Sequence, residues 1–214
     1  FNVRASETNI FKFSNNIFKE FIGQAKKRGI KFNITTNNED LDLFVDRNLM
    51  DKVYFNLLSN AFKFTPDNGR IDLEIHDNVG ESTVKIHFKD NGIGIPENEL
   101  KNVFTPFFKG SNNRKNSSGV GLHLSKQFVE LHLGKIEVKS YHGTEFVITL
   151  FKGNTHFNED QIVIDPDLAD TTLRDFTGEI TMDDNYMDLD TKIREDGYSI
   201  LLIEDNRDLS FFLK

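Results

Sequence analysis

Asn56, Asn60 and Lys63 are the residues whose types and spacing first suggest chemistry. They lie in the stretch 46–69, which has the apolar spacing of one amphipathic helix, and they share an arc of roughly 60° at about 100° per residue. Two carboxamides and an ammonium group on one stripe can bind a metal–phosphate complex, or they can simply face solvent. Asparagine is a poor helix former, so two of them one turn apart need a reason. The helix alone leaves both interpretations open.

A second candidate group begins at Asp90, which ends a predicted strand and is followed by Gly92 and Gly94. A carboxylate at this place can accept a hydrogen bond from an exocyclic amine such as adenine N6. The two glycines would let the backbone come close to a ligand. Asp-Asn-Gly is also a common turn sequence, so an ordinary turn is the alternative.

A third group is the pair Gly119 and Gly121, which opens a predicted helix. Backbone N–H groups at such a helix start can bind phosphate oxygens, and the helix dipole favours the anion. The alternative is a plain helix start after a flexible loop. That loop, residues 105–118, is polar and contains Lys109, so it can either close over phosphates or remain an ordinary solvated loop. Three phenylalanines beside it can anchor it or pack in the core: Phe104, Phe107 and Phe108.

The composition limits the chemistry that these residues can do. The chain has 214 residues, 37% of them hydrophobic, with 21 Phe and no Cys, which excludes disulfides and thiolate metal sites. No apolar run is long enough to span a membrane, and the N-terminus does not resemble a signal peptide. The first 152 residues carry a net charge of +3, which permits an anionic ligand, whereas residues 153–197 carry −10. The six histidines show no metal-ligand spacing, and none is assigned as a phosphoacceptor.

Hydrophobic periodicity predicts the elements that must position these groups. The pattern predicts three main helices: one capped by Ser6 or Thr8 and running to about residue 28, one capped by Asp46 and stopped by Pro66 and Gly69, and one from Gly119 to about residue 133. It also predicts strands at 30–35 and 41–45, hairpins at 70–76/83–89 and 135–140/144–151, and a short helix at 97–103. This order predicts an α/β sandwich, with a mixed sheet of about five strands covered on one face by the three main helices.

The charge pattern also predicts how the chain is divided. Residues 1–152 form the main domain, residues 153–197 an acidic and partly disordered linker, and residues 198–214 the truncated start of a further domain. Within the linker, residues 162–164 are apolar enough to pair as a strand. The chain starts at Phe1 and stops inside an apolar-patterned run, so we expect it to be a fragment of a longer protein.

The order of the motifs resembles a known family. NLLSNAFKFT, DNGIGIP, FTPFFKG and GVGLHLSKQFVELHLG, followed by GTEFVITL, resemble the N, G1, F and G2 boxes of sensor histidine kinases. These kinases belong to the GHKL ATPase superfamily, shared with gyrase, the MutL mismatch-repair proteins and a heat-shock chaperone. The resemblance covers about residues 1–151. The tail YSILLIEDNRDLSFFLK resembles the first strand of a response-regulator receiver domain, and together they resemble a hybrid two-component sensor of the Bacteroidetes type.

The resemblance implies ATP and Mg²⁺ as cofactors and assigns roles by position. Asn60 would bind Mg²⁺ through its amide oxygen, with Asn56 and Lys63 supporting catalysis at the triphosphate. Asp90 would accept from the adenine amine, and Thr144 would complete the adenine pocket. The implied nucleotide-binding residues are Asn60, Lys63, Phe64, Asp90, Gly92, Gly94, Ile95, Phe104, Phe108, Lys109, Gly119, Val120, Gly121, Leu122 and Thr144. Glu204 and Asp205 match the acidic pair that binds Mg²⁺ in receivers, in a site that would be incomplete here, or they simply end a strand.

Two departures from the family pattern, and one position that separates the branches of the superfamily, refine the expected activity. His123 replaces the last glycine of GxGLGL, which leaves the loop geometry open. The phosphoacceptor histidine helix is absent, so the fragment should bind ATP without phosphorylating itself. Asn56 stands where hydrolytic members carry a general-base Glu, and an amide cannot take a proton at neutral pH.

The resemblance therefore implies a kinase domain that presents the γ-phosphate of Mg-ATP to a histidine on an upstream helical domain. A nucleotide-binding pseudokinase and a hydrolytic GHKL ATPase are the alternatives. The implied partners are the upstream dimerisation and phosphotransfer helices and a downstream receiver, in a homodimer that binds no nucleic acid. The implied location is the cytoplasmic portion of an inner-membrane sensor.

Overall fold

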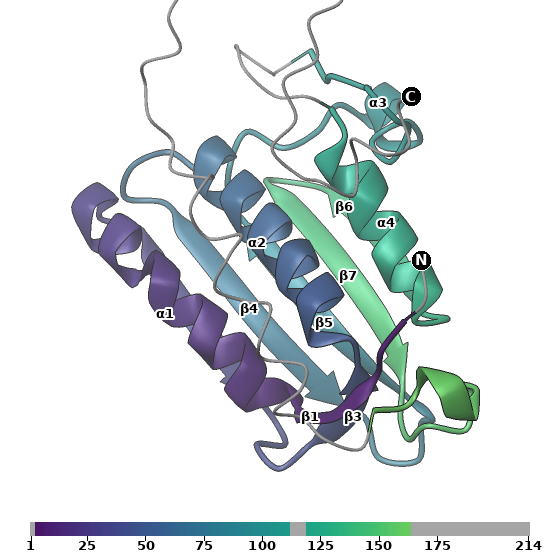
Figure 1. Cartoon of the computed structure of the whole chain (residues 1–214). Helices are drawn as coiled ribbons and strands as arrows, with labels where there is room; N and C mark the ends of the chain where they lie inside the picture. The colour runs from purple at the N-terminus through teal and green to yellow at the C-terminus, as the bar shows by residue number, and fades with distance from the viewer. Residues whose placement is uncertain (1–2, 112–118, 164–214) are drawn as a thin grey trace, which may run out of the picture. The chain divides into compact units, whose positions relative to one another are not determined.

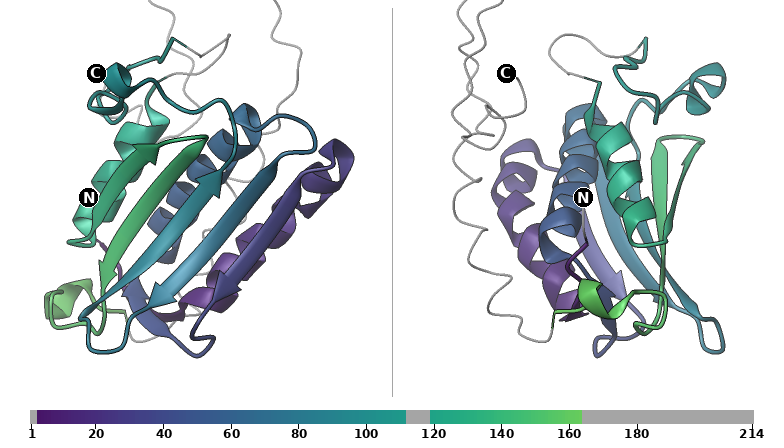
Figure 2. Two further views of the ribbon diagram at one scale, coloured as in Figure 1. Left: turned by 180° about the vertical axis from the view of Figure 1, so that it is seen from behind. Right: turned by 45° about the vertical axis from the view of Figure 1, so that its right-hand side comes forward.

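The fold was analysed in a computed structural model, which describes residues 3–111 and 119–163. One five-stranded sheet has the spatial order β2 (Lys31–Thr36), β4 (Arg70–Asp77), β5 (Thr83–Asp90), β7 (Thr144–Phe151) and β6 (Lys135–Ser140). β2 and β4 are parallel and the other neighbours antiparallel, so the sheet is mixed. Its covered face packs against α1 (Ile10–Arg28), α2 (Arg47–Phe64) and α4 (Gly121–Leu131), and its other face is open (Figures 1 and 2). The predicted α/β sandwich is confirmed.

A separate two-stranded ribbon begins the domain. β1 (Ser6–Asn9) pairs antiparallel with β3 (Asp42–Val45), outside the main sheet. The prediction that Ser6 or Thr8 caps the first helix was therefore wrong, because both residues belong to β1. Asn9 caps α1 instead: its side-chain oxygen accepts from the Lys12 backbone N–H at 2.8 Å.

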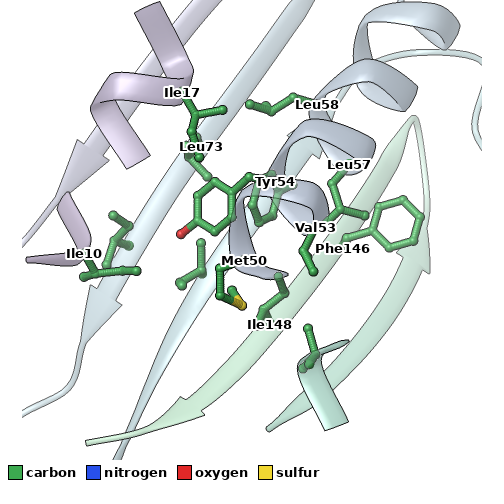
Figure 3. Packing of buried hydrophobic residues seen from close by; sticks show 14 of the residues in the cluster. Ile10, Ile17, Met50, Val53, Tyr54, Leu57, Leu58, Leu73, Phe146 and Ile148 are labelled. Atoms are coloured by element: carbon green, nitrogen blue, oxygen red, sulfur yellow. The ribbon is translucent and has the colours of Figure 1, made fainter. Parts of the chain in front are cut away.

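α2 lies between α1 and α4 in the helical layer (Figure 1), and it contributes more buried core residues than either of them, several of which Figure 3 shows. Its first turn is capped, as predicted, by Asp46, which accepts from the backbone N–H groups of Asn48 and Leu49 at 3.1 and 3.2 Å. Its core-facing side chains recur at helical spacing: Leu49, Met50, Val53, Tyr54, Leu57, Leu58, Ala61 and Phe62. The buried Tyr54 hydroxyl forms a 3.0 Å hydrogen bond with Ser14 Oγ of α1, so its burial leaves no polar atom unpaired.

The other end of α2 is held by Arg28, the last residue of α1. Its guanidinium donates to the backbone carbonyls of Phe62 and, at 2.6 Å, of Thr65, and it pairs with Asp67 at 2.8 Å. The last carbonyls of a helix lack partners within the helix. Arg28 supplies those partners, and it thereby fixes the end of α2 that carries Lys63 and Phe64.

A buried histidine joins α4 to the start of α2. His132 accepts from the Asp46 backbone N–H through Nε2 at 2.9 Å, and its Nδ1 lies 2.6 Å from the Phe128 carbonyl oxygen. The ring must therefore be neutral, with its proton on Nδ1. Burial lowers the pKa of His132 below its ordinary value of 6.5, against the raising effects of the Phe128 carbonyl and of Asp46. Sequence periodicity showed nothing of this role, because the partner lies 86 residues away.

We expect the domain to lose stability in mild acid because of His132. The depressed pKa means that the unfolded chain takes up the proton first, so stability is complete above about pH 6.5 and falls as the pH drops below that value. Protonation also removes the acceptor for the Asp46 N–H, at a cost of about 1 kcal/mol. Thermal unfolding between pH 7.5 and 5.5 measures the loss, which His132→Gln should flatten. The exposed His142→Gln is the control; an equal slope in His132→Gln and wild type would contradict this role.

The segment after β7 pairs with the first described residues of the chain. After β7 the chain makes a short helix, η1 (Glu159–Gln161), and Phe157 before it is buried against His132. The Ala5 N–H donates to the Gln161 carbonyl at 2.7 Å, and the Val163 N–H donates to the Ala5 carbonyl at 2.8 Å. Ile162 thus pairs as a parallel bridge, as predicted for residues 162–164, of which residue 164 lies outside the described part.

The rest of the predicted organisation lies outside the described residues. This applies to most of the acidic linker and to the whole segment 198–214. The predicted domain limits therefore stay predictions. No helix in the described ranges is long and apolar enough to cross a bilayer.

Candidate nucleotide site

The polar stripe of α2 forms one wall of the site. The Asn56 side chain donates through Nδ2 to Ser125 Oγ of α4 at 2.9 Å. The Asn60 Nδ2 lies 3.5 Å from Asn56 Oδ1, a long hydrogen bond along the helix. Both asparagines are half-buried, and Lys63 is exposed with its ammonium group 5.3 Å from the Phe64 ring centroid. The stripe is thus partly covered by α4 and is not a plain solvent face.

The first turn of α4 meets this stripe at Gly121. A Cβ on Gly121 would lie 2.4 Å from Asn56 Oδ1, so a side chain there would displace the Asn56 amide from its present position. Val120 is the N-cap residue of α4, and its carbonyl accepts from the Leu124 N–H at 3.0 Å. Leu122, in the same turn, packs against the hydrophobic core. The residues predicted for phosphate binding are therefore brought against the residues predicted for metal binding.

Asp90 occupies the other side of the site, at the end of β5. Its Oδ1 accepts from the backbone N–H of Gly92 at 2.8 Å and of Thr144 at 3.3 Å. Thr144 is the cross-strand partner of Asp90 in β7. Burial raises the pKa of Asp90, whereas the Gly92 and Thr144 N–H groups and the Thr144 hydroxyl lower it in part. These donors hold the carboxylate in one orientation, so it can present an acceptor to an amine.

Gly92 joins Asp90 to the end of α2. A Cβ there would lie 2.4 Å from the Phe64 carbonyl oxygen, which also accepts from the Ile93 N–H at 3.3 Å. Because Phe64 follows Asn60 by one turn, this contact links the carboxylate to the amide stripe. Gly143, in the β6–β7 turn, approaches even closer: its Cβ would fall 1.9 Å from the Asp90 carbonyl oxygen.

Ser140 is a residue of the site that sequence reasoning missed. Its hydroxyl accepts from the Ile95 N–H at 2.7 Å and donates to the Gly143 carbonyl at 2.7 Å. It also lies against Gly94, where a Cβ would be 2.8 Å from its Oγ and φ is +70°. Ser140 therefore holds the glycine loop after Asp90 against the β6–β7 turn. A serine at the end of a predicted strand gave no signal of this.

His123 finds a partner that explains the departure from the glycine pattern. Its Nδ1 lies 3.1 Å from the Phe104 carbonyl oxygen, so the side chain holds the segment before the loop. The Phe104 ring packs edge-on against Phe146 in the sheet, and the Lys126 ammonium lies 5.9 Å from its centroid. The histidine is thus accommodated inside α4 and contributes a contact that glycine would lack.

Other predicted residues lie at the edge of the site. Gly119 has a φ of +73°, and a Cβ on it would meet the Phe107 backbone at 2.7 Å and the Phe108 carbonyl at 2.8 Å. Phe108 is half-buried, Lys109 is exposed, and Phe107 is 75% exposed. Residues 112–118, which include the loop cations Arg114 and Lys115, lie outside the described residues, as do Glu204 and Asp205.

These contacts define a class of protein. A mixed sheet with three helices on one face carries an oriented carboxylate at the end of β5, an amide stripe on α2 and a glycine-opened helix against that stripe. Oriented carboxylates recognise amines, and glycine-opened helix starts bind phosphates. The arrangement fits a nucleotide-binding ATPase domain.

Comparison with known proteins places the chain more closely. Residues 45–154 match the family described as "Histidine kinase-, DNA gyrase B-, and HSP90-like ATPase", which is just over half of the chain, so the chain belongs to this family. Histidine kinase P4 of Formosa agariphila is 30% identical over 226 residues, covering 100% of this chain and 16% of that protein. Sensor histidine kinase WalK of Bacillus subtilis is 31% identical over 143 residues, covering 65% of this chain and 23% of that protein. The chain thus spans under a quarter of either relative.

Solved structures agree with the family. The catalytic domain of histidine kinase ThkA has a TM-score of 0.63 and 27% identity, and the match covers 69% of this chain and 95% of that one. A structure of ThkA in complex with the response regulator protein TrrA has a TM-score of 0.62 and 26% identity, covering 72% of this chain and 43% of that one. The chain contains the ATP-binding catalytic domain found in histidine kinases.

Proposed function

We propose that this chain binds Mg-ATP and presents the γ-phosphate to a histidine on a helical domain upstream of it. The observation that carries the proposal is the setting of Asn56. Its amide donates to Ser125 and lies against Asn60, and no carboxylate stands in this place to take a proton from water. The site can hold a triphosphate beside an acceptor that brings its own nucleophilic nitrogen.

The adenine would be recognised by Asp90. Its carboxylate is oriented by Gly92 and Thr144, and a carboxylate accepts from an exocyclic amine but repels a carbonyl oxygen in the same position. This supports adenine over guanine. Phe64 and Ile95 lie beside the same loop and would contact the base.

Asn60 fits the Mg²⁺ that accompanies ATP. Because its Nδ2 is directed to Asn56, its Oδ1 is turned to the other side of the amide, and carbonyl oxygens are ligands that Mg²⁺ accepts. The bound ion would neutralise phosphate charge. The chain's own residues would then position the triphosphate: Lys63 by charge, and Gly119, Gly121 and Leu122 through the start of α4.

The wider architecture is part of the proposal, and one relative and the sequence of the tail support it. Histidine kinase P4 aligns along the whole chain, and the tail has the pattern of a receiver start. We infer a hybrid sensor of the Bacteroidetes type, dimeric through its upstream helices, with this domain on the cytoplasmic side of the inner membrane. Glu204 and Asp205 would be the beginning of the receiver's Mg²⁺ site.

Two measurements test the function. Isothermal titration with ATP and Mg²⁺ should show saturable binding by the wild-type chain, and absence of binding would sink the proposal. The chain extended to include its upstream helical domain should form acid-labile phosphohistidine from labelled ATP. Binding without phosphohistidine would favour a pseudokinase, and multiple-turnover phosphate release by the chain alone would favour a hydrolytic ATPase.

A further inference from the structure

Ser125 carries a buried hydroxyl to which the family resemblance assigns no role, although the residue lies within the stretch GVGLHLSKQFVELHLG. It lies on α4, one turn after Gly121, and is 2% exposed. Its Oγ accepts from Asn56 Nδ2 at 2.9 Å, across 69 residues of sequence. A buried polar atom on a helix face otherwise lined by Phe128 and Val129 requires a partner, and Asn56 is that partner.

This hydrogen bond determines how the Asn56 amide is turned. With Nδ2 used by Ser125, Oδ1 is directed to Asn60 Nδ2 at 3.5 Å. The amide also lies close to the first turn of α4, since its Oδ1 is 2.4 Å from where a Cβ on Gly121 would stand. Ser125, Asn56 and Asn60 therefore form a chain of contacts that starts on α4 and ends at the proposed metal ligand.

We propose that Ser125 is a positioning residue for phosphoryl transfer, acting through Asn56 to orient the amide of Asn60 towards Mg²⁺. The inference rests on the proposed function. The same hydrogen bond links α4, which begins at Gly121, to α2, which carries the proposed metal ligand. Removal of the hydroxyl would leave Asn56 free to rotate its amide, and Asn60 would lose the partner that fixes its oxygen.

The test compares Ser125→Ala with wild type. Calorimetry measures the affinity of each protein for ATP at increasing Mg²⁺ concentrations. The Mg²⁺ concentration that gives half of the maximal increase in ATP affinity should be about 10-fold higher for the variant. This is the size of effect expected when a metal ligand loses the hydrogen bond that orients it. Binding of ATP in EDTA should be unchanged, because Asp90 and the glycines are intact. Ser125→Thr, which keeps the hydroxyl, should restore most of the Mg²⁺ response. Ser14→Ala, the other buried helical serine bonded to α2, controls for a general loss of packing.

A double-variant cycle shows whether the effect passes through Asn56. In an Asn56→Ala background, Ser125→Ala should change the Mg²⁺ response by less than twofold. Equal effects in both backgrounds, or an unchanged Mg²⁺ response in Ser125→Ala, would overturn the positioning role while leaving the proposed function intact. If wild type itself shows no Mg²⁺-dependent binding of ATP, the proposed function fails and this role fails with it. Thermal unfolding confirms that each variant is folded.

Discussion

Asp90→Asn is expected to weaken ATP binding about 100-fold, which corresponds to about 2.7 kcal/mol. The wild-type carboxylate accepts from Gly92 and Thr144 with Oδ1 and keeps acceptor capacity for an amine. An asparagine has one acceptor oxygen and one donor group. If its oxygen stays with Gly92 and Thr144, its NH₂ meets the adenine amine as donor against donor. If it turns over, the NH₂ meets two backbone N–H groups instead.

The pH dependence of ATP binding should also come from the Asp90 carboxylate. Burial raises the pKa of Asp90, so the carboxylate protonates at a higher pH than an ordinary Asp when the solution is acidified. ATP affinity should therefore be constant at neutral pH and fall on acidification before exposed carboxylates titrate. The variant should lack this fall. Calorimetric titrations across the pH range measure both effects.

Asp42→Asn provides a matched control, because Asp42 is an exposed residue of the β1–β3 ribbon. It should bind ATP as wild type does. Wild-type affinity in Asp90→Asn would contradict adenine recognition by this carboxylate. Thermal unfolding of both variants shows whether each is folded, so that a loss of affinity is not a loss of the fold.

Asn60→Ala should reduce phosphohistidine formation at least about 100-fold, since one preorganised group of this kind contributes two to three orders of magnitude to a transfer rate. The reaction is that of the chain extended to its upstream helical domain. Alanine removes the amide oxygen that would contact Mg²⁺ but leaves Asp90 intact, so binding of ATP in EDTA should change little. The rate, and not the metal-free affinity, is the quantity expected to change.

Asn60→Asp should also transfer phosphate much more slowly than wild type, although the aspartate provides an oxygen ligand for Mg²⁺. The carboxylate would face Asn56 Oδ1, where wild type has an N–H at 3.5 Å, and oxygen would meet oxygen. Asn33→Ala, on the open face of β2, removes an amide hydrogen-bonded to Asp72 and serves as the control. Undiminished transfer by Asn60→Ala would remove the role assigned to this residue.

Much of this fold was readable from local sequence because its elements are strongly patterned. The hairpins around residues 77–82 and 141–143 alternate cleanly, and Asp46 marks the start of α2 with an N-cap that the structure confirms. The glycines at 92 and 121 were also informative. A Cβ at Gly92 would lie 2.4 Å from the Phe64 backbone carbonyl, and a Cβ at Gly121 would displace the Asn56 amide, so each constraint is visible in the sequence as a glycine.

The parts that sequence missed depend on partners far along the chain. Ser6 and Thr8 looked like helix caps because nothing local shows that they pair with Val45 and Leu43 of β3, at least 35 residues later. His132 and Ser125 looked like ordinary positions of a helix, and Ser140 like the end of a strand. Each has a role set by one hydrogen bond to a distant element, and a single polar residue has no periodicity from which to predict it.

The bridge between Ala5 and Ile162 has a mechanical consequence. Because the two segments are parallel, the chain arrives at one end of this short pairing and departs at the other. Tension applied between the residues before Val3 and those after Val163 would load the hydrogen bonds of Ala5 in shear and would not pass through the sheet. The Arg4 N–H also donates to Asp46 Oδ2 at 3.0 Å, so the start of α2, the helix that carries Asn56 and Asn60, would bear part of the same load.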